Sequence, residues 1–468
     1  MAYLFTALPF VVVLFAALAV IGWVGFSLSR PELSVYLLLA VLVAFSGSSY
    51  GQLEAERTIY GRGTGQLYFS IVNIFLWGIG IVIALGNAFS YRRFDATPLA
   101  KYFWAITLLI LGNAIYAAAS DDPSIQILSA FSYKGLLNIF NMAIFFYVCI
   151  NAFGTQQGAS KLLRLLLVAI GLRGIFGIVR WAFFGGDPSN VYDNIERTGT
   201  KLTFFDVNDG FLATLAVFCS AWLLTYRKPF LALWEQYFLW GLLILETAII
   251  VLSFRRSSLI SMGLSAMLFI ALLPNRKKLL ATFITAGVLF GATTVLTALR
   301  LSKVRGAGAD RGFLFDIVGN GRSSDSGSRF LEYTETWRSL GDNWFFGNGM
   351  WGTLQSNLAS LNYHAGDFTF VHSGFGHILL KGGVFGLIVF IAMLFSFTFY
   401  FVRTRKLLHG ELLMLADTGA AGMLFWLPSL LIGTPIIEFR SMMMLGFALA
   451  LPFIAMRAAG TGKHHAAA

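Results

Sequence analysis

Apolar runs of about 20 residues alternate with short polar connectors along almost the whole chain. A run of that length can cross a bilayer as one helix. We therefore expect an all-α fold, a polytopic transmembrane helix bundle of about 12–13 spans. The run near residues 3–28 lacks the basic start of a cleaved signal and is expected to stay as a helix. The expected spans are centred near residues 15, 39, 77, 110, 143, 173, 217, 241, 265, 288, 387, 422 and 449.

Basic residues mark one side of this bundle. Clusters fall after every second span, at Arg30, Arg92/Arg93/Lys101, Lys161/Arg164, Arg227/Lys228, Arg276/Lys277/Lys278, Arg403/Arg405/Lys406 and Arg457/Lys463. The positive-inside rule assigns these clusters to the cytoplasm, which puts the N-terminus outside and the C-terminus inside. The segments 47–65, 185–207, 300–371 and 434–440 then face outside. The chain divides into ten spans over 1–299, a long outer loop over 300–371, and further spans with a cytoplasmic tail over 372–468.

The long outer loop has structure of its own. Residues 319–328 read as a turn that ends in a helix cap. A short amphipathic helix is predicted to begin at Arg329, with Tyr333 and Trp337 on the same face at a spacing of four residues. The sequence Gly347-Asn348-Gly349 ends this segment.

Composition excludes several classes of protein. The chain has 468 residues, of which 57% are hydrophobic and only 12% charged, whereas soluble domains carry roughly 25% charged residues. The net charge of +11 lies mostly in short loops, where it sets topology, and no nucleic-acid-binding module is visible. The two cysteines fall inside apolar spans and do not suggest a disulfide. No histidine or acidic spacing indicates a metal site.

Arginines near the outer face are the first candidates for chemistry. Arg255 and Arg256 end an outer connector, where they could anchor the helix at the interface or bind phosphate through their planar forks. Arg173 and Arg180 share one face of the sixth span. Arg173 lies at mid-membrane depth, and Glu246 is its expected partner in a buried ion pair. Arg180 lies nearer the outer face and could reach a ligand.

A histidine and a further arginine fall at the same outer interface. His372 opens the eleventh span, where a lone histidine is either a cap, a packed residue or a titratable group at a site. Arg329 is unfavourable at a helix N-terminus, so either solvent or a bound phosphate must account for it. His377, five residues after His372, is expected to be structural.

The order of these motifs resembles the O-antigen ligase/polymerase superfamily, and the ligases most of all. His372-Ser373, followed after nine residues by Gly383-Val384-Phe385-Gly386, is similar to the family's histidine and glycine motif. Three further pieces agree in order: the arginine, tryptophan and Phe-Gly-x-Gly pattern of the loop (Arg329, Trp337, Phe346-Gly347-Asn348-Gly349), Arg256 at the end of a span, and Phe204 to Asn208 before a helix. One departure is Lys381, where many members carry an acidic residue, and it leaves the subfamily open.

The resemblance implies a GT-C-type membrane glycosyltransferase that needs no metal or other cofactor. Its donor would be an undecaprenyl-pyrophosphate-linked glycan, and the enzyme would lie in the bacterial inner membrane with its site on the periplasmic face. A ligase passes the glycan to lipid A–core, whereas a polymerase passes it to another glycan repeat. The resemblance favours the ligase and leaves the polymerase open.

These residues suggest a division of roles within the family's reaction. Arg256 and Arg329, with Arg255 or Arg180, would neutralise the departing pyrophosphate, and His372 would take the proton of the acceptor hydroxyl. Asn208 is a further candidate for substrate binding. Tyr333 and Trp337 would stack on sugars or pack the loop helix onto the bundle. A polysaccharide flippase is the alternative of another class, although internal repeats are expected of a transporter and none is visible.

Overall fold

The structure is a computed structural model that describes residues 23, 25, 30–45, 60, 70–89, 97–122, 125, 127–131, 134–186, 202–204, 206–303, 325–354 and 371–465. This part of the chain is helical and contains no strand. Its helices are α2 (Pro31–Ala44), α3 (Ile71–Phe89), α4 (Ala100–Ala119), α5 (Ile127–Ala130), α6 (Leu137–Ala152), α7 (Gln156–Phe183), α9 (Val207–Tyr226), α10 (Leu233–Leu252), α11 (Arg256–Leu272), α12 (Asn275–Lys303), α13 (Asp325–Leu340), α14 (Gly374–Arg405), α15 (Gly410–Ile432) and α16 (Phe439–His465).

The protein is an all-α polytopic membrane bundle, as the apolar pattern predicts. Every span centre expected from residue 39 onward falls inside one of these helices. The expected centre near residue 15 lies outside the described residues. Eight of the described helices are long and apolar enough to cross a membrane, namely α3, α4, α7, α9, α10, α14, α15 and α16. The helices α2, α6 and α11 are apolar but shorter.

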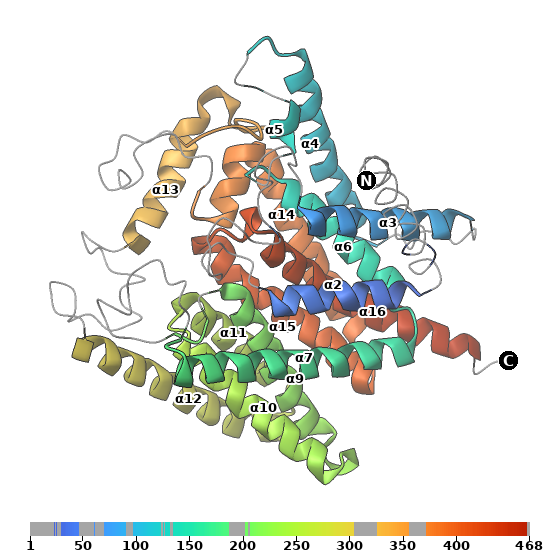
Figure 1. The fold of residues 1–468 in the computed structure, drawn as a ribbon, viewed down its shortest axis with the longest axis vertical. Coiled ribbons are helices and arrows are strands. Elements are labelled where there is room, and N and C mark those ends of the chain that lie inside the picture. The colour runs from blue at the N-terminus through green and yellow to red at the C-terminus, as the bar shows by residue number, and fades with distance from the viewer. Residues whose placement is uncertain are drawn as a thin grey trace, which may run out of the picture.

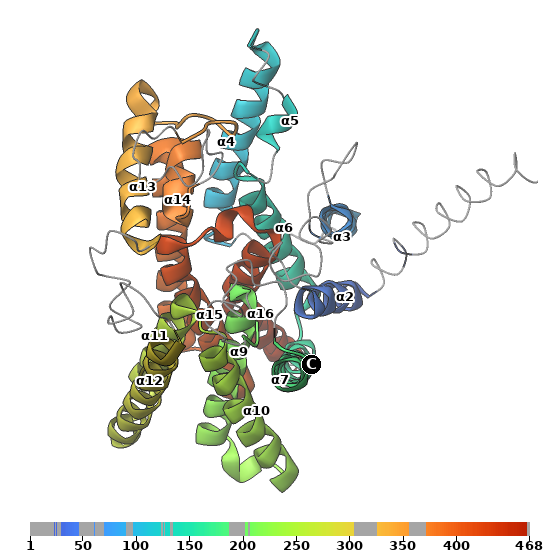
Figure 2. The same ribbon diagram turned by 60° about the vertical axis from the view of Figure 1, so that its left-hand side comes forward.

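Three helices form the centre of the bundle. In α9, α15 and α16, 78–83% of the most apolar stretch is buried within the protein, against 28% in α4 and α10. The helix α16 packs against α15 and α6, while α9 packs against α10 and α15. In Figure 1, α2 and α7 lie side by side next to this centre, and Figure 2 shows both nearly end on. The partly buried helices therefore expose apolar side chains such as Trp104 and Trp234 at the periphery, where lipid would cover them.

Short polar side chains fix where several helices begin. Thr155 caps α7 by accepting from the Gly158 N–H, and Ser373 caps α14 by accepting from the Gly376 N–H at 3.1 Å each. Asp206 caps α9 in the same way, through the Asn208 N–H at 2.9 Å. Each side chain satisfies one of the first-turn N–H groups that a helix cannot bond internally. The local sequence thus sets the ends of α7, α9 and α14.

The long loop contains the predicted helix, but the helix starts earlier than expected. The helix α13 begins at Asp325, so Arg329 is its fifth residue and does not begin it. The turn residues Asp325 to Ser328 have joined the helix because Asp and Ser are favourable at a helix start. Past the first turn the helix dipole is weak, so it no longer argues against arginine at this position. Figure 2 shows α13 alongside the upper part of α14.

The end of this loop segment is bonded to a break in α14. At Gly383 the backbone leaves the helical conformation, with φ 63° and ψ −165°. The Trp344 and Phe345 carbonyls accept from the Val384 and Phe385 N–H groups at 2.9 and 3.0 Å. In return, the Leu380 carbonyl accepts from the Asn348 N–H at 2.9 Å. The loop backbone therefore replaces hydrogen bonds that the break removes, as irregular backbone at membrane depth requires.

The contact between the loop backbone and the break in α14, which we call the joint, explains why glycine is required in both glycine motifs of the sequence. Any Cβ on Gly347 would lie 2.5 Å from the Gly383 nitrogen, and a Cβ on Gly383 would collide with the Phe345 carbonyl. Both residues also have positive φ, a conformation that glycine adopts at little cost. Lys381, buried beside the joint, donates to the carbonyls of Met350 and Gly352 at 3.1 and 2.5 Å. The lysine that departs from the family pattern thus holds the loop onto α14.

Candidate functional site

All the segments predicted to face outside that the structure describes meet at one end of the bundle, which we call the outer end. The Thr203 N–H donates to the Leu252 carbonyl at 3.2 Å, which joins the segment before α9 to the end of α10. The Tyr333 hydroxyl of the loop helix donates to the Leu431 carbonyl at the end of α15, at 2.9 Å. Tyr60 stacks on Phe439 at the start of α16, with ring centroids 5.8 Å apart.

Three of the basic clusters predicted to face the cytoplasm have described contacts at the opposite end. Arg164 lies 3.6 Å from Glu411 at the start of α15, and the Arg457 guanidinium donates to the Ile150 carbonyl at 2.9 Å. Arg405 pairs with Asp417 at 2.7 Å. The two sets of connectors are therefore separated as the charge pattern predicts.

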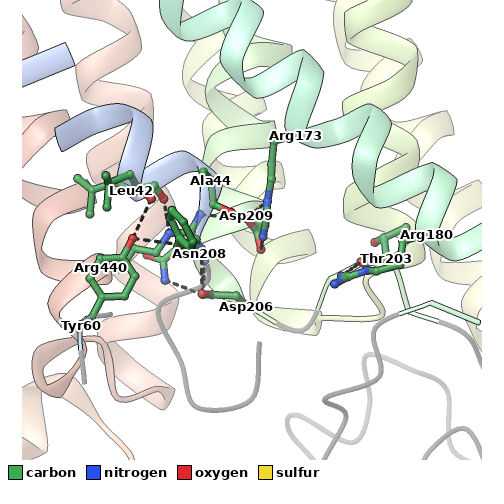
Figure 3. Close-up of polar contacts among 12 residues, drawn as sticks. Leu42, Ala44, Tyr60, Arg173, Arg180, Thr203, Asp206, Asn208, Asp209 and Arg440 are labelled. Atoms are coloured by element: carbon green, nitrogen blue, oxygen red, sulfur yellow. Dashed lines mark hydrogen bonds and ion pairs between the residues drawn. The ribbon is translucent and has the colours of Figure 1, made fainter. Parts of the chain in front are cut away.

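A fully buried ion cluster lies at the outer end, between α9 and α16 (Figure 3). The Arg440 guanidinium donates to Asp206 at 2.9 Å, to Asp209 at 3.0 Å and to the Leu42 carbonyl at 2.5 Å. Its side chain has no exposed surface. Buried charges are tolerated when they are paired and hydrogen-bonded on all sides, and Arg440 meets this condition. We define Arg440, Asp206, Asp209 and Arg173 as the Arg440 cluster.

The expected pair between Arg173 and Glu246 is wrong. Arg173 pairs with Asp209 at 3.2 Å and donates to the Ala44 carbonyl at 2.9 Å, as Figure 3 shows. Glu246 is buried and lies against Gly174, where any Cβ would clash with its carboxylate. The sequence gives the membrane depth of each residue, but not the rotation of each helix about its axis. Two acids at similar depth therefore could not be told apart.

Arg180 lies two turns of α7 beyond Arg173 and on the same face, since both guanidiniums contact the Phe204 ring. Its guanidinium donates to the Thr203 carbonyl at 2.6 Å and lies 5.1 Å from the centroid of the Phe204 ring. The centroid of the Phe176 ring lies 5.4 Å from the same guanidinium. The side chain is half-buried, so part of it remains open to a ligand. Backbone and ring contacts of this kind hold a guanidinium in place.

Asn208, a candidate for substrate binding, is turned into the protein. It is fully buried, and its amide nitrogen donates to Asp206 at 2.6 Å. Through Asp206 it is joined to Arg440 (Figure 3). Its contacts make it a support of the Arg440 cluster.

Arg255 and Arg256 begin α11 after an unusual backbone turn. Phe254, directly before them, has φ 53°, a left-handed conformation that costs a bulky residue about 1–2 kcal/mol. Such strain is found preferentially at functional sites. Arg255 has no side-chain cap bond, and the first-turn N–H groups of α11 have no partner within the helix. Two half-buried guanidiniums and a helix N-terminus together favour an anion at this place.

A carboxyl group from the turn between α15 and α16 faces Arg255. Glu438 accepts from the Ser441 hydroxyl at 2.6 Å. Burial, together with the negative charge of Asp206, raises the pKa of Glu438 to about 7, while Ser441, Arg255 and Arg440 act in the opposite direction. The charges of both Arg255 and Arg440 thus act on the Glu438 carboxyl.

His372 lies two residues before α14 and contacts the loop helix. Its Nδ1 is 2.9 Å from the Glu332 Oε1, and its backbone N–H donates to the other oxygen, Oε2, at 2.6 Å. The residues that follow them, Ser373 and Tyr333, are also hydrogen-bonded to each other, hydroxyl to hydroxyl. Glu332 was not among the residues expected from the sequence. Its signal was an acidic residue on the buried side of an amphipathic helix, three positions after Arg329.

The remaining candidates of the loop helix lie around this pair. Arg329 belongs to α13, one turn before Glu332, and its side chain lies outside the described part. Trp337 is 53% exposed, so it is available for a ligand, whereas Tyr333 bonds to Leu431 and Ser373 and so packs the loop helix onto the bundle. His377 is buried, with Nε2 at 3.2 Å from the Gly135 carbonyl, which agrees with the structural role expected for it.

The described residues hold no group of three or more histidine, cysteine, aspartate or glutamate side chains placed to bind a metal ion. Comparison with known proteins gives one informative match. A family model described as O-antigen ligase matches residues 241–391, which run from α10 through α13 to the first half of α14. No curated protein matches the chain. The matched region contains Arg255, Arg256, Arg329, Glu332 and His372.

Proposed function

Because the chain belongs to the O-antigen ligase/polymerase superfamily, we propose that it is an inverting, metal-independent glycosyltransferase of the ligase type. Its donor is an undecaprenyl-pyrophosphate-linked glycan and its acceptor is lipid A–core. It works in the bacterial inner membrane with its site on the periplasmic face, in a bundle of the GT-C type. The supporting observation is that the loop helix carrying Arg329 docks directly on His372, at the same end of the bundle where α11 begins with Arg255 and Arg256.

In this proposal the arginines bind the leaving group. Cleavage of the sugar–phosphate bond leaves the bonding electron pair on the pyrophosphate oxygen. Arg256 and Arg329 neutralise the charge that develops there, with Arg255 and Arg180 as further contacts. Removing one such donor typically lowers a rate by about 100-fold or more. The first-turn N–H groups of α11 carry partial positive charge, so they would also stabilise this negative charge.

His372 acts on the acceptor. Its ring takes the proton from the acceptor hydroxyl while that oxygen attacks the anomeric carbon, so that the new glycosidic bond forms as the old bond to phosphate breaks. A single displacement inverts the anomeric centre. Trp337 is exposed next to this position and offers a flat apolar face for a sugar ring. We assign Asn208 the indirect role of holding Asp206, in place of direct contact with substrate.

The test uses the purified full chain in detergent with an undecaprenyl-pyrophosphate-linked glycan. One reaction contains lipid A–core and another contains free repeat units. Transfer to lipid A–core supports a ligase, whereas elongation of the repeat would show the polymerase of the same superfamily. No joining in detergent, together with movement of the lipid-linked glycan across sealed vesicles, would show a flippase and overturn the proposal.

Two variants test the assigned residues. His372→Ala is expected to lower transfer by about 10²–10⁴-fold, the usual contribution of a general base. Arg329→Ala is expected to lower it by about 100-fold. His409→Ala, an exposed histidine that precedes α15, is the matched control. Transfer by His372→Ala at the rate of the control would exclude the general-base role.

A further inference from the structure

We propose that Glu332 is a positioning residue that sets the tautomer and the direction of the His372 ring. The inference rests on the proposed function, because it concerns how the base of that reaction is held. Glu332 lies on the loop helix, 40 positions before His372, and its contact is visible only in the fold.

The carboxylate holds two different parts of the same residue. Oε1 lies 2.9 Å from the ring Nδ1, and Oε2 accepts from the His372 backbone N–H at 2.6 Å. A side chain fixed relative to its own backbone cannot rotate about χ1 without breaking one of these bonds. Hydrogen bonds to an ionised acceptor are also roughly twice as strong as neutral ones. Glu332 therefore determines the orientation of the imidazole.

This contact also determines which nitrogen reacts. A carboxylate accepts and does not donate, so Nδ1 bears the proton and Nε2 is left with its lone pair. Only Nε2 can then take the proton of an acceptor hydroxyl. The side chain of Glu332 is 3% exposed and that of His372 is 21% exposed, so the orienting group is enclosed while the histidine side chain is partly exposed. Nucleophile or base activation by a third, orienting group is a general arrangement in enzymes.

Further contacts keep Glu332 in place. The Thr336 hydroxyl donates to the Glu332 carbonyl at 2.6 Å, one turn along α13. Tyr333, the next residue, bonds to the Leu431 carbonyl of α15 and to Ser373. Glu332 thus reaches His372 only when α13 lies against the ends of α14 and α15. Docking of the loop helix assembles the acid–base pair.

The test compares Glu332→Gln with Glu335→Gln in the purified full chain. Glu335 is also buried on α13, but it pairs with Arg338 at 2.7 Å and does not contact His372. Glutamine at position 332 can present an amide N–H to Nδ1, which favours the wrong tautomer. We expect kcat to fall by about 100-fold in Glu332→Gln, with the KM for the lipid-linked donor unchanged, and to stay within about twofold in Glu335→Gln.

Two readouts separate positioning from a general defect in folding. Adding Glu332→Gln to His372→Ala should cause no further loss, because the acid acts only through the ring. Formate should restore part of the activity of Glu332→Ala but none of His372→Ala, since the small carboxylate can fill the space that the alanine leaves. A structural role would give additive losses and no rescue.

The outcomes distinguish the two proposals. If His372→Ala remains active, the proposed function loses its base and the role of Glu332 falls with it. If His372→Ala is inactive while Glu332→Gln behaves as Glu335→Gln does, only the inference on Glu332 is overturned. Additive losses in the double variant, or absence of formate rescue, would likewise overturn it.

Discussion

The Arg440 cluster and the Glu332–His372 pair both join acidic and basic side chains at the outer end, but they differ in how far they are exposed. Arg440 has no exposed surface and its donors are taken up by Asp206, Asp209 and the Leu42 carbonyl. His372 is bonded through Nδ1 and its backbone, and its side chain keeps 21% of its surface exposed. The first group is suited to hold helices together. The second keeps part of the imidazole side chain at the surface, where a substrate could reach it.

The two groups also differ in origin. The Arg440 cluster joins α7, α9 and α16, which are all membrane-spanning helices. The Glu332–His372 pair joins one such helix to the long loop. Charge alone therefore does not mark a functional residue in this protein, since the most deeply buried ions stabilise the bundle. The informative features are the partial exposure of the His372 side chain and the position of its partner 40 residues away in the sequence.

The largest effect is expected at Arg440. Arg440→Met removes the guanidinium that pairs with two buried carboxylates, Asp206 and Asp209, and loss of one partner from such a buried group costs about 3–5 kcal/mol of folding free energy. Thermal unfolding of the purified protein in detergent measures this loss. Arg338→Met is the matched control, because Arg338 is 67% exposed and its pair with Glu335 contributes at most about 1 kcal/mol. Equal stability of the two variants would contradict the stabilising role of the Arg440 cluster.

A smaller effect is expected at the joint of loop and helix. Gly383→Ala places a Cβ against the Phe345 carbonyl in a left-handed conformation, which costs about 1–2 kcal/mol from the backbone alone. The loop end should detach, and because the Asn348 amide also bonds to the Ser339 carbonyl at 2.8 Å, α13 should shift with it. Transfer activity should fall while the bundle stays folded.

Gly386→Ala is the control for this prediction, because it belongs to the same sequence motif. The atoms nearest to a Cβ at that position are the Ile378 and Leu109 side chains at 3.5 Å, an ordinary packing distance. We expect Gly386→Ala to keep the activity of the unsubstituted protein. Protease sensitivity of the loop, measured with the transfer assay, reports detachment directly. An intact loop in Gly383→Ala would contradict the interpretation.

The smallest effect is expected from Glu438, which lies beside the Arg440 cluster. Its pKa is raised to about 7, so the folded protein favours the protonated carboxyl. Stability from this group is present at low pH and is lost as the pH rises through about 7. Between pH 5 and pH 8 the unfolding free energy should fall by about 1 kcal/mol more than in Glu438→Gln, a modest figure because the side chain is partly exposed. The exposed Asp121→Asn is the control, and identical pH profiles for all three proteins would disprove the prediction.

The positions of the helices could be predicted from the sequence because apolar length is a local signal. The positions near 39, 77 and 449 lie in helices for this reason. The start of α13 was placed four residues late, since Asp325 to Ser328 favour both a turn and a helix start. Local signals thus locate an element better than they locate its boundary.

Pairing was much harder to predict than position. Arg173 binds Asp209 in place of Glu246, because helix rotation is set by packing and not by hydropathy. Glu332 and Asp206 are decisive only through partners 40 and 234 positions away. Such contacts arise where several helix ends converge, and no pattern along one segment encodes them. His372, Arg255 and Arg256 could be chosen as candidates because they stand out within their own segments.

The break at Gly383 has a consequence for exchanging parts between related proteins. The N–H groups of Val384 and Phe385 find their acceptors at Trp344 and Phe345, so a span and an external segment share one hydrogen-bonded unit. A chimera made to change acceptor preference must therefore inherit residues 341–354 and 371–386 from the same parent. A splice point between Leu340 and the start of α14 could leave the N–H groups of Val384 and Phe385 without their hydrogen-bond acceptors in apolar surroundings.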